Sequence, residues 1–182
     1  MIVVDCETTG LEPHANGLVS IGAVLFEDQA KKFYVEMKPA EGTILSPQSL
    51  EINGYTPEYL EKIPLTTYGA LQKYGTWVEE VEPAREKHFL GGFNTHFDGN
   101  FIRFAYARVP HLLEPRFDFR YVDAYSVFIA KYGTKYLGYS LRMVCEALGV
   151  EPEPYPHNAL NGAIKTAEVL KIMLEDGKSA NL

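Results

Sequence analysis

The first forty residues contain three apolar segments with the patterns of β-strands. Ile2–Val4 is β-branched and leads directly into Asp5, and residues 18–26 form a nearly continuous apolar run, as in a strand buried on both faces. Residues 32–37 instead alternate between apolar and polar side chains, which is typical of a strand with one solvent-facing side. These patterns predict three successive strands arranged as a meander.

The rest of the chain shows helical and strand patterns in turn. Residues 39–64 are rich in proline and glycine and predict a long loop with one short helix at 47–52. Further helices are expected at 66–81, 97–108, 124–132, 140–148 and 160–174, and further strands at 88–93 and 121–124. A strand meander followed by alternating helices and strands predicts an α/β fold, with a mixed sheet flanked by helices.

The length and composition narrow the class of protein. A chain of 182 residues predicts one domain, taken as residues 1–176, with a short tail at 177–182. No apolar run approaches the ~20 residues of a membrane helix, and no basic segment precedes an apolar one at the N-terminus, so we expect a cytoplasmic protein without membrane contact. Cys6 and Cys145 match neither a disulfide framework nor a zinc site.

The charge distribution is uneven. The net charge of −7 argues against a protein that coats long nucleic acids, because such binding requires many cationic side chains to neutralise phosphates. Residues 103–142, however, contain seven basic and three acidic residues, together with ten of the 22 Phe and Tyr residues. This segment could guide a strand, although aromatic residues are more often core and basic ones more often a solvated face.

The first candidate for chemistry is a pair of carboxylates at the end of the first predicted strand. Asp5 and Glu7 are two residues apart, so both side chains lie on one face of the strand and Cys6 lies on the other. Solvated carboxylates are also common where strands meet loops. The Thr8-Thr9-Gly10 turn that follows is small and polar, which would let its hydroxyl and backbone groups approach a phosphate or a sugar.

Two further polar positions begin predicted helices. Asp98 begins a helix that is otherwise mostly apolar, where a carboxylate also has a simpler role at the positive end of the helix dipole. His157 precedes the last helix, and on its own it is a plain surface histidine, as is His96.

Together these residues resemble a known family. Asp5-x-Glu7 with its Thr-Thr-Gly turn, Phe97-Asp98 and His157 are similar in order and spacing to the DEDD-type 3′-to-5′ exonucleases of the histidine subgroup. The likeness extends over residues 3–174, and segments 33–36 and 45–54 resemble the ribonuclease T branch, which trims RNA 3′ ends and also acts on single-stranded DNA. The resemblance implies a ribonuclease H-like, mixed five-stranded sheet flanked by helices.

The resemblance also assigns roles to residues. It implies that Asp5 bridges two Mg²⁺ or Mn²⁺ ions, that Glu7 holds the nucleophile-side ion and Asp98 the leaving-group side, and that His157 accepts a proton from the attacking water. The ligand is expected to be a single-stranded 3′ end or a nucleoside monophosphate, and the likeness is compatible with a homodimer. The residues expected to hold that end are Thr8, Thr9, Leu11, Gln48, Ile52 and Phe97.

The sequence departs from the family pattern at one metal ligand. The pattern has a fourth metal-binding aspartate five residues after the histidine, where this chain has Gly162, and the nearby Asn158 and Asn161 are neutral. Glycine also costs about 1 kcal/mol relative to alanine inside a helix, and nothing in the local sequence requires it. The chain is therefore a working enzyme with a weakened nucleophile-side metal, a degenerate relative, or an inactivated version of an active parent.

A second departure concerns the bases. Leu11 and Ile52 stand where ribonuclease T-like proteins use aromatic residues that stack on the terminal bases, which predicts a looser base preference.

Two classes of function follow. The leading hypothesis is a metal-dependent 3′-to-5′ exonuclease acting on single-stranded RNA or DNA, with a polymerase-associated proofreading subunit as a variant of it. The alternative is a non-catalytic module that binds nucleic-acid ends or nucleotides on the same scaffold.

Overall fold

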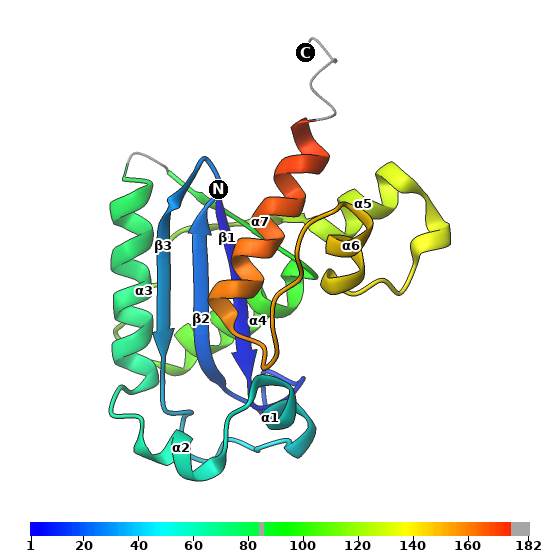
Figure 1. Ribbon diagram of the computed structural model, residues 1–182. Coiled ribbons are helices and arrows are strands. Elements are labelled where there is room, and N and C mark those ends of the chain that lie inside the picture. Colours follow the sequence, from blue (N-terminus) through cyan, green and yellow to red (C-terminus); the bar gives the residue numbers. More distant parts are fainter. Residues whose placement is uncertain (84–85, 176–182) are drawn as a thin grey trace.

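A computed structural model describes residues 1–83 and 86–175. Its core is a five-stranded mixed sheet in the order β3-β2-β1-β4-β5 (Figure 1). The strands are β1 (Ile2–Thr8), β2 (Leu18–Leu25), β3 (Asp28–Glu36), β4 (His88–Gly92) and β5 (Phe117–Asp123). The helices are α1 (Pro47–Asn53), α2 (Pro57–Lys62), α3 (Thr67–Val81), α4 (Thr95–Arg108), α5 (Ala124–Tyr132), α6 (Leu141–Ala147) and α7 (Ala159–Glu175), with a 3₁₀ turn, η1 (Thr134–Tyr136).

The predicted α/β class and the order of its elements are confirmed. β1, β2 and β3 form the antiparallel meander, and β4 and β5 pair in parallel with their neighbours. The predicted tail at 177–182 lies outside the described residues. Within those residues, no helix has both the length and the apolar character needed to cross a membrane.

Three elements differ from the expected pattern. β3 begins at Asp28 rather than at residue 32. α2 lies inside the predicted loop, and its local signal is Thr56-Pro57: the Thr56 hydroxyl accepts a hydrogen bond from the Tyr59 N–H, and proline occupies the first helical turn. β5 begins at Phe117 rather than at residue 121. The sequence pattern missed its first four residues because aromatic and charged side chains alternate there, in a strand at the edge of the sheet. Only pairing with β4 makes them a strand.

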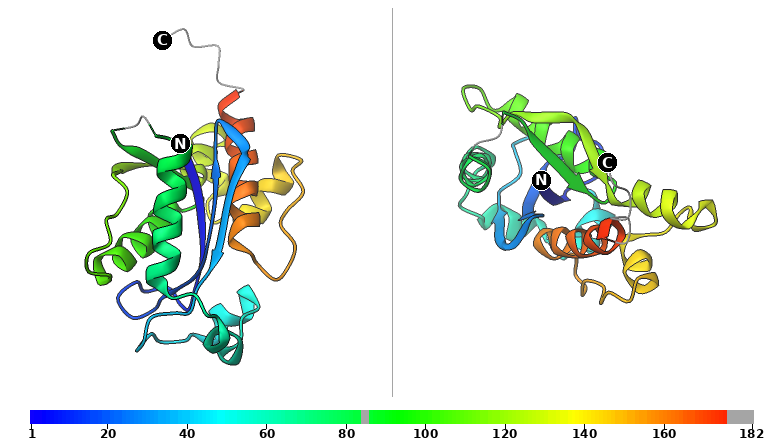
Figure 2. Two further views of the ribbon diagram at one scale, coloured as in Figure 1. Left: turned by 90° about the vertical axis from the view of Figure 1, so that its left-hand side faces the viewer. Right: turned by 90° about the horizontal axis from the view of Figure 1, so that it is seen from above.

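Helices cover both faces of the sheet, as Figure 2 shows in two further views. On one face, Ile2, Val4 and Cys6 of β1 pack with side chains of α3 and α4. On the other, Val3 packs in a cluster with α5, α6 and α7. Because side chains alternate along a strand, Asp5 and Glu7 lie on the α7 side.

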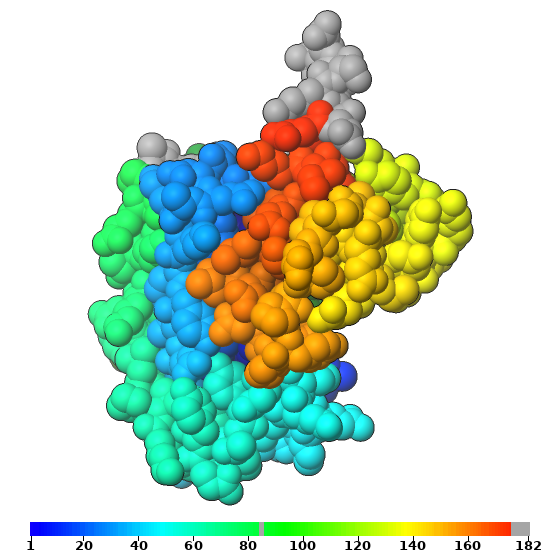
Figure 3. Space-filling model, in the orientation of Figure 1, coloured from blue at the N-terminus to red at the C-terminus, as the bar shows by residue number. Residues whose placement is uncertain are grey.

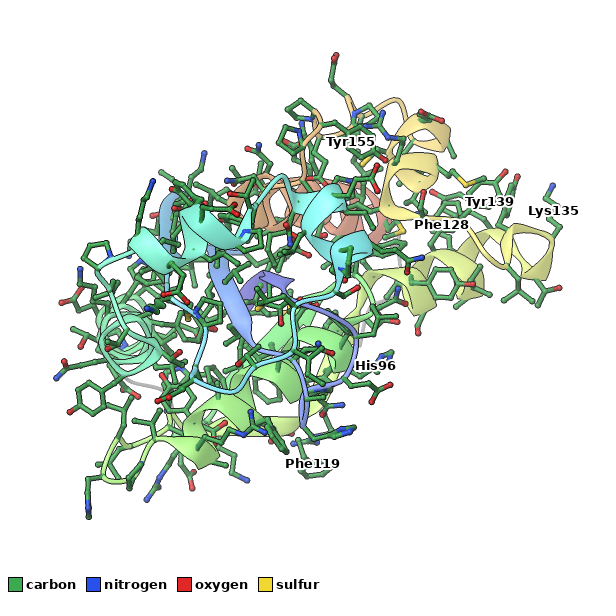
Figure 4. All side chains as sticks on the ribbon, turned by 90° about the horizontal axis from the view of Figure 1, so that it is seen from below. His96, Phe119, Phe128, Lys135, Tyr139 and Tyr155 are labelled. Atoms are coloured by element: carbon green, nitrogen blue, oxygen red, sulfur yellow. The ribbon has the colours of Figure 1, made fainter. Side chains whose placement is uncertain are left out.

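The positions for chemistry lie where β1 and β4 separate. These parallel strands pair only at Ile2 with Leu90 and at Val3 with Gly91, although β1 continues to Thr8. The N-terminal turn of α4 fills the space beyond, and the carboxyl ends of parallel strands are where α/β folds usually place ligands. Figure 4 looks onto this end and shows Tyr155, before α7, and His96, on α4, on opposite sides of it.

Candidate active site

Asp5 and Glu7 are both largely enclosed by protein. Glu7 is 8% exposed, and burial together with the charge of Glu153 raises its pKa to about 7. Burial raises the pKa of Asp5 well above its ordinary value, and repulsion from the carboxylates of Asp98, Glu7 and Glu153 adds to this effect. These four carboxylates therefore lie at one end of the sheet. The sequence predicted this arrangement for Asp5, Glu7 and Asp98, but not for Glu153.

Asp98 is anchored to the backbone of the central strand. It lies in the first turn of α4 and is 2% exposed, and its Oδ1 accepts a hydrogen bond of 2.9 Å from the Cys6 N–H. That N–H is available because β4 no longer pairs with β1 there. Burial raises the pKa of Asp98, and the Cys6 N–H opposes the increase. The role of Asp98 therefore goes beyond helix-end electrostatics.

His157 lies just outside α7 and faces the same end of the sheet. Asn158 caps the helix, because its Oδ1 accepts hydrogen bonds from the N–H groups of Leu160 and Asn161 at 3.0 and 3.3 Å. The His157 N–H donates to the carbonyl of Ile52 in α1 at 3.1 Å. Its ring remains one-third exposed, with Nδ1 at 3.5 Å from Glu153 Oε1.

The start of α7 lies unusually close to the sheet. A Cβ added to Gly22 of β2 would stand 2.2 Å from the backbone of Ala159, so glycine permits this approach. Gly162, one turn further along, is buried against Asp5: a Cβ there would stand 2.4 Å from Asp5 Oδ2. A side chain at position 162 would therefore require the Asp5 carboxylate to turn.

The Thr-Thr-Gly turn is used mainly to hold its own loop. The Thr9 side chain is fully buried; its hydroxyl donates to the Ile44 carbonyl at 2.7 Å and accepts from the Gly17 N–H at 3.0 Å. The Thr8 hydroxyl donates to the Gly10 carbonyl at 2.6 Å. These hydroxyls position the backbone after Glu7, rather than extending into solvent.

The other predicted substrate residues are more accessible. Leu11 is 74% exposed and Ile52 is 51% exposed, Gln48 is exposed on α1, and Phe97 is half-buried with its ring 4.9 Å from that of Phe101. α1 is tied to the site at its C-terminal end, where the Asn53 amide donates to the Thr8 carbonyl at 3.1 Å. Exposed apolar groups therefore border the buried carboxylates.

Sequence reasoning missed Glu153. It lies in the segment between α6 and α7, outside regular structure, and no periodic pattern marks it. The signal available was its spacing: four residues before His157, in a run of alternating prolines that restricts the backbone.

The donor set fits a hard divalent cation. Carboxylate oxygens are the ligands that Mg²⁺ and Mn²⁺ prefer, and the Oε2 atom of Glu153 is buried with no hydrogen-bond partner among the described residues. As the side chains are oriented, no three His, Cys, Asp or Glu residues in the described ranges converge on a single ion position. Binding an ion would therefore require these carboxylates to rotate.

Comparisons with known proteins found chains that are similar in sequence and in fold. The 3′-5′ DNA exonuclease Cap18 of Escherichia coli is 29% identical over 174 residues, which span 94% of this chain and 90% of that protein. The nuclease domain of 3′hExo, a DEDDh family member bound to rAMP, has a TM-score of 0.77 at 19% identity and covers 97% of this chain and 92% of its own. E. coli Exonuclease I, in complex with a 5cy-dT13 oligonucleotide, has a TM-score of 0.71 at 18% identity over 97% of this chain and 40% of its own.

These structural likenesses confirm the predicted ribonuclease H-like fold. The sequence profile of the RNase_T family, described as an exonuclease family, matches residues 2–170. The chain therefore belongs to the RNase_T exonuclease family, as a DEDD-type 3′-to-5′ exonuclease.

Proposed function

We propose that this protein is a metal-dependent exonuclease that removes nucleotides from the 3′ ends of single-stranded RNA or DNA. The observation that carries the proposal is the gathering of three carboxylates at one end of β1, with Glu7 and Asp98 buried, Asp5 partly buried and His157 at the same end of the sheet. Carboxylates crowded together in this way are costly unless a cation or a function compensates them.

Asp5, Glu7 and Asp98 are the residues that would hold the metal. Two Mg²⁺ or Mn²⁺ ions, when bound, would stabilise negative charge on the attacking and leaving oxygens of the phosphodiester. Asp5 is central among these ligands, because the charges of both Glu7 and Asp98 act on it. The hydrogen bond from Cys6 orients Asp98 from behind.

His157 is placed to move a proton. Its Nδ1 faces Glu153, and its backbone is held by α1, so the ring orientation is restricted. We expect Nε2 to accept the proton of the attacking water, a role that imidazole side chains commonly take as general bases.

The border of the site suits the last nucleotides of a strand. Leu11, Ile52 and Phe97 offer apolar surface to bases and Gln48 offers an amide. The carbonyls of Thr8 and Thr9 already accept hydrogen bonds within the protein, so this turn shapes the border of the site. The bound rAMP and oligonucleotide of the two solved relatives support a 3′ end or a nucleoside monophosphate as the ligand. The net charge of −7 is consistent with a short contact at a strand end.

The test is cleavage of 5′-labelled single-stranded RNA and DNA of one sequence in Mn²⁺, with products resolved by length. We expect a ladder that shortens from the 3′ end and that disappears in Asp98→Asn but persists in Asp28→Asn, an exposed control in β3. Binding of the 3′ end in EDTA with no ladder at any Mn²⁺ concentration would contradict the proposal and indicate a non-catalytic binding module.

A further inference from the structure

Glu153 is enclosed in a way that is unusual for a carboxylate outside regular structure. Its side chain is 11% exposed, although it lies in a proline-rich loop segment. Oε1 faces His157 Nδ1 at 3.5 Å, whereas Oε2 is buried and has no hydrogen-bond partner in the described part of the chain. Burial raises the pKa of Glu153 even though His157, the Asn158 N–H and Arg142 oppose the increase, so a further partner for the buried oxygen is the expected compensation.

Glu153 lies at the end of β1 that carries the carboxylates. Its Oε1 lies 3.5 Å from Nδ1 of His157, whose N–H donates to the carbonyl of Ile52 in α1, and the C-terminal end of α1 is in turn hydrogen-bonded to the end of β1. From this position the charge of Glu153 helps to raise the pKa of both Asp5 and Glu7. A carboxylate from the loop before α7 therefore lies at the same end of the sheet as the two strand residues that would hold metal.

Gly162 has no side chain to offer as the fourth metal-binding carboxylate. The α7 backbone at Gly162 faces Asp5 directly, and an added Cβ would stand 2.4 Å from Asp5 Oδ2 and 2.8 Å from its Cγ. A side chain at 162 would require Asp5 to turn, whereas Glu153 approaches the same carboxylates from the loop before α7.

The segment that carries Glu153 is held in place. The Arg142 guanidinium of α6 donates to the Glu153 carbonyl at 2.8 Å and lies 4.9 Å from the Tyr155 ring centre, and that ring lies 4.8 Å from the His157 ring. Figure 3 shows the segment in orange, packed between α6, α7 and the region of α1. Glu153 is therefore positioned before any ligand arrives.

We propose that Glu153 supplies the fourth metal-binding carboxylate of the site, in place of the aspartate that the family pattern has at position 162. The proposal rests on the proposed function, because it assigns one more ligand to the same metal site. It replaces the interpretation that no acidic residue compensates for Gly162.

The experiment measures Mn²⁺ binding without nucleic acid, by calorimetry and by the loss of the free Mn²⁺ resonance signal. We expect Glu153→Gln to weaken binding of at least one ion by roughly tenfold or more, since losing even a residue that only orients a metal ligand costs about 10–100-fold. Glu151→Gln, an exposed glutamate of the same segment, should bind as the unchanged protein does.

Two results would overturn the assignment. One is unchanged Mn²⁺ affinity in a folded Glu153→Gln protein whose cleavage rate is reduced, which would mean that Glu153 acts only by orienting His157. The other is a tenfold gain in affinity from Gly162→Asp alone, which would mean that the fourth ligand was missing; this arm does not depend on the folding of the Glu153 variant. Failure of the unchanged, folded protein to bind Mn²⁺ would instead reject the metal-dependent function itself.

Discussion

Two regions meet at the candidate site and are held by different means. Asp5 and Glu7 belong to β1, the central strand, and Asp98 is fixed by a hydrogen bond to that strand's backbone. His157 and Glu153 lie in the segment before α7, which side-chain contacts and a helix cap hold in place. We call these the strand region and the loop region.

The difference indicates a division of labour. The backbone of β1 cannot move without breaking the sheet, so its carboxylates can reach a metal ion only by rotating their side chains about a fixed strand. The loop region can vary in sequence without changing the fold, because its backbone is outside the sheet. This explains how a family ligand can be missing from α7 while a carboxylate from the neighbouring loop faces the same place.

The largest effect is expected in the strand region. Asp98→Asn should reduce cleavage by about 10³-fold, because a lost metal ligand removes several kcal/mol of transition-state stabilisation. The amide oxygen can still accept the Cys6 N–H, and one buried negative charge is gone, so the variant should be at least as stable in EDTA. Cleavage rates and Tm in EDTA test both parts; normal cleavage would remove Asp98 from the metal site.

A smaller effect is expected in the loop region. His157→Gln should reduce cleavage by roughly 10²-fold, the lower end of the usual contribution of a general base. Its Mn²⁺ affinity should stay near that of the unchanged protein, because the imidazole is assigned to proton transfer. Parallel kinetics and metal titrations separate the two regions, and a matching loss of Mn²⁺ affinity would show that His157 is a ligand.

The border of the site allows a change in the opposite direction. Ile52→Phe should tighten binding of a single-stranded 3′ end about fivefold or more, because stacking on a base contributes roughly 1–3 kcal/mol. Ile52 is half-exposed on α1, so the larger ring needs no repacking of the core. Fluorescence anisotropy with a labelled oligonucleotide measures this, with Leu113→Phe, in the exposed loop after α4, as the control. Equal gains in both variants would rule out a specific stacking position.

The smallest expected effect is on stability against pH. The pKa of Glu7 is about 7 in the folded protein and near 4.5 when unfolded, so the folded state binds this proton more tightly. The stability it contributes is complete below about pH 4.5 and is lost as the pH rises toward 7. In EDTA, Tm should therefore fall over this range by several degrees, at about 2–4 °C per kcal/mol.

Mn²⁺ should reduce that fall, because bound cations compensate the ionised carboxylates. Glu7→Gln should flatten the profile in EDTA, whereas Glu151→Gln should keep it. A Tm in EDTA that rises between about pH 4.5 and 7 would mean that the strand carboxylates are not crowded as the structure has them.

Much of the site could be predicted from the amino-acid sequence. Period-two alternation put Asp5 and Glu7 on one face of a strand, and the helix signals put Asp98 and His157 at helix starts; all four positions agree with the structure. The role of Thr9 could not be predicted, because its hydroxyl bonds to the carbonyl of Ile44, far along the chain. A hydroxyl next to a candidate site is the same sequence signal whether it faces a ligand or closes a loop.

Local periodicity and motifs a few residues long were enough to predict the order of the elements, the fold class and the carboxylates of the strand region. That Gly162 lies against Asp5, and that Glu153 lies at the same end of the sheet as Asp5 and Glu7, emerges only in the folded chain. Those relations join β1 to a loop and a helix that lie about 150 residues further along the chain. Electrostatic repulsion and steric exclusion depend on distance in space, which spacing along the chain does not record.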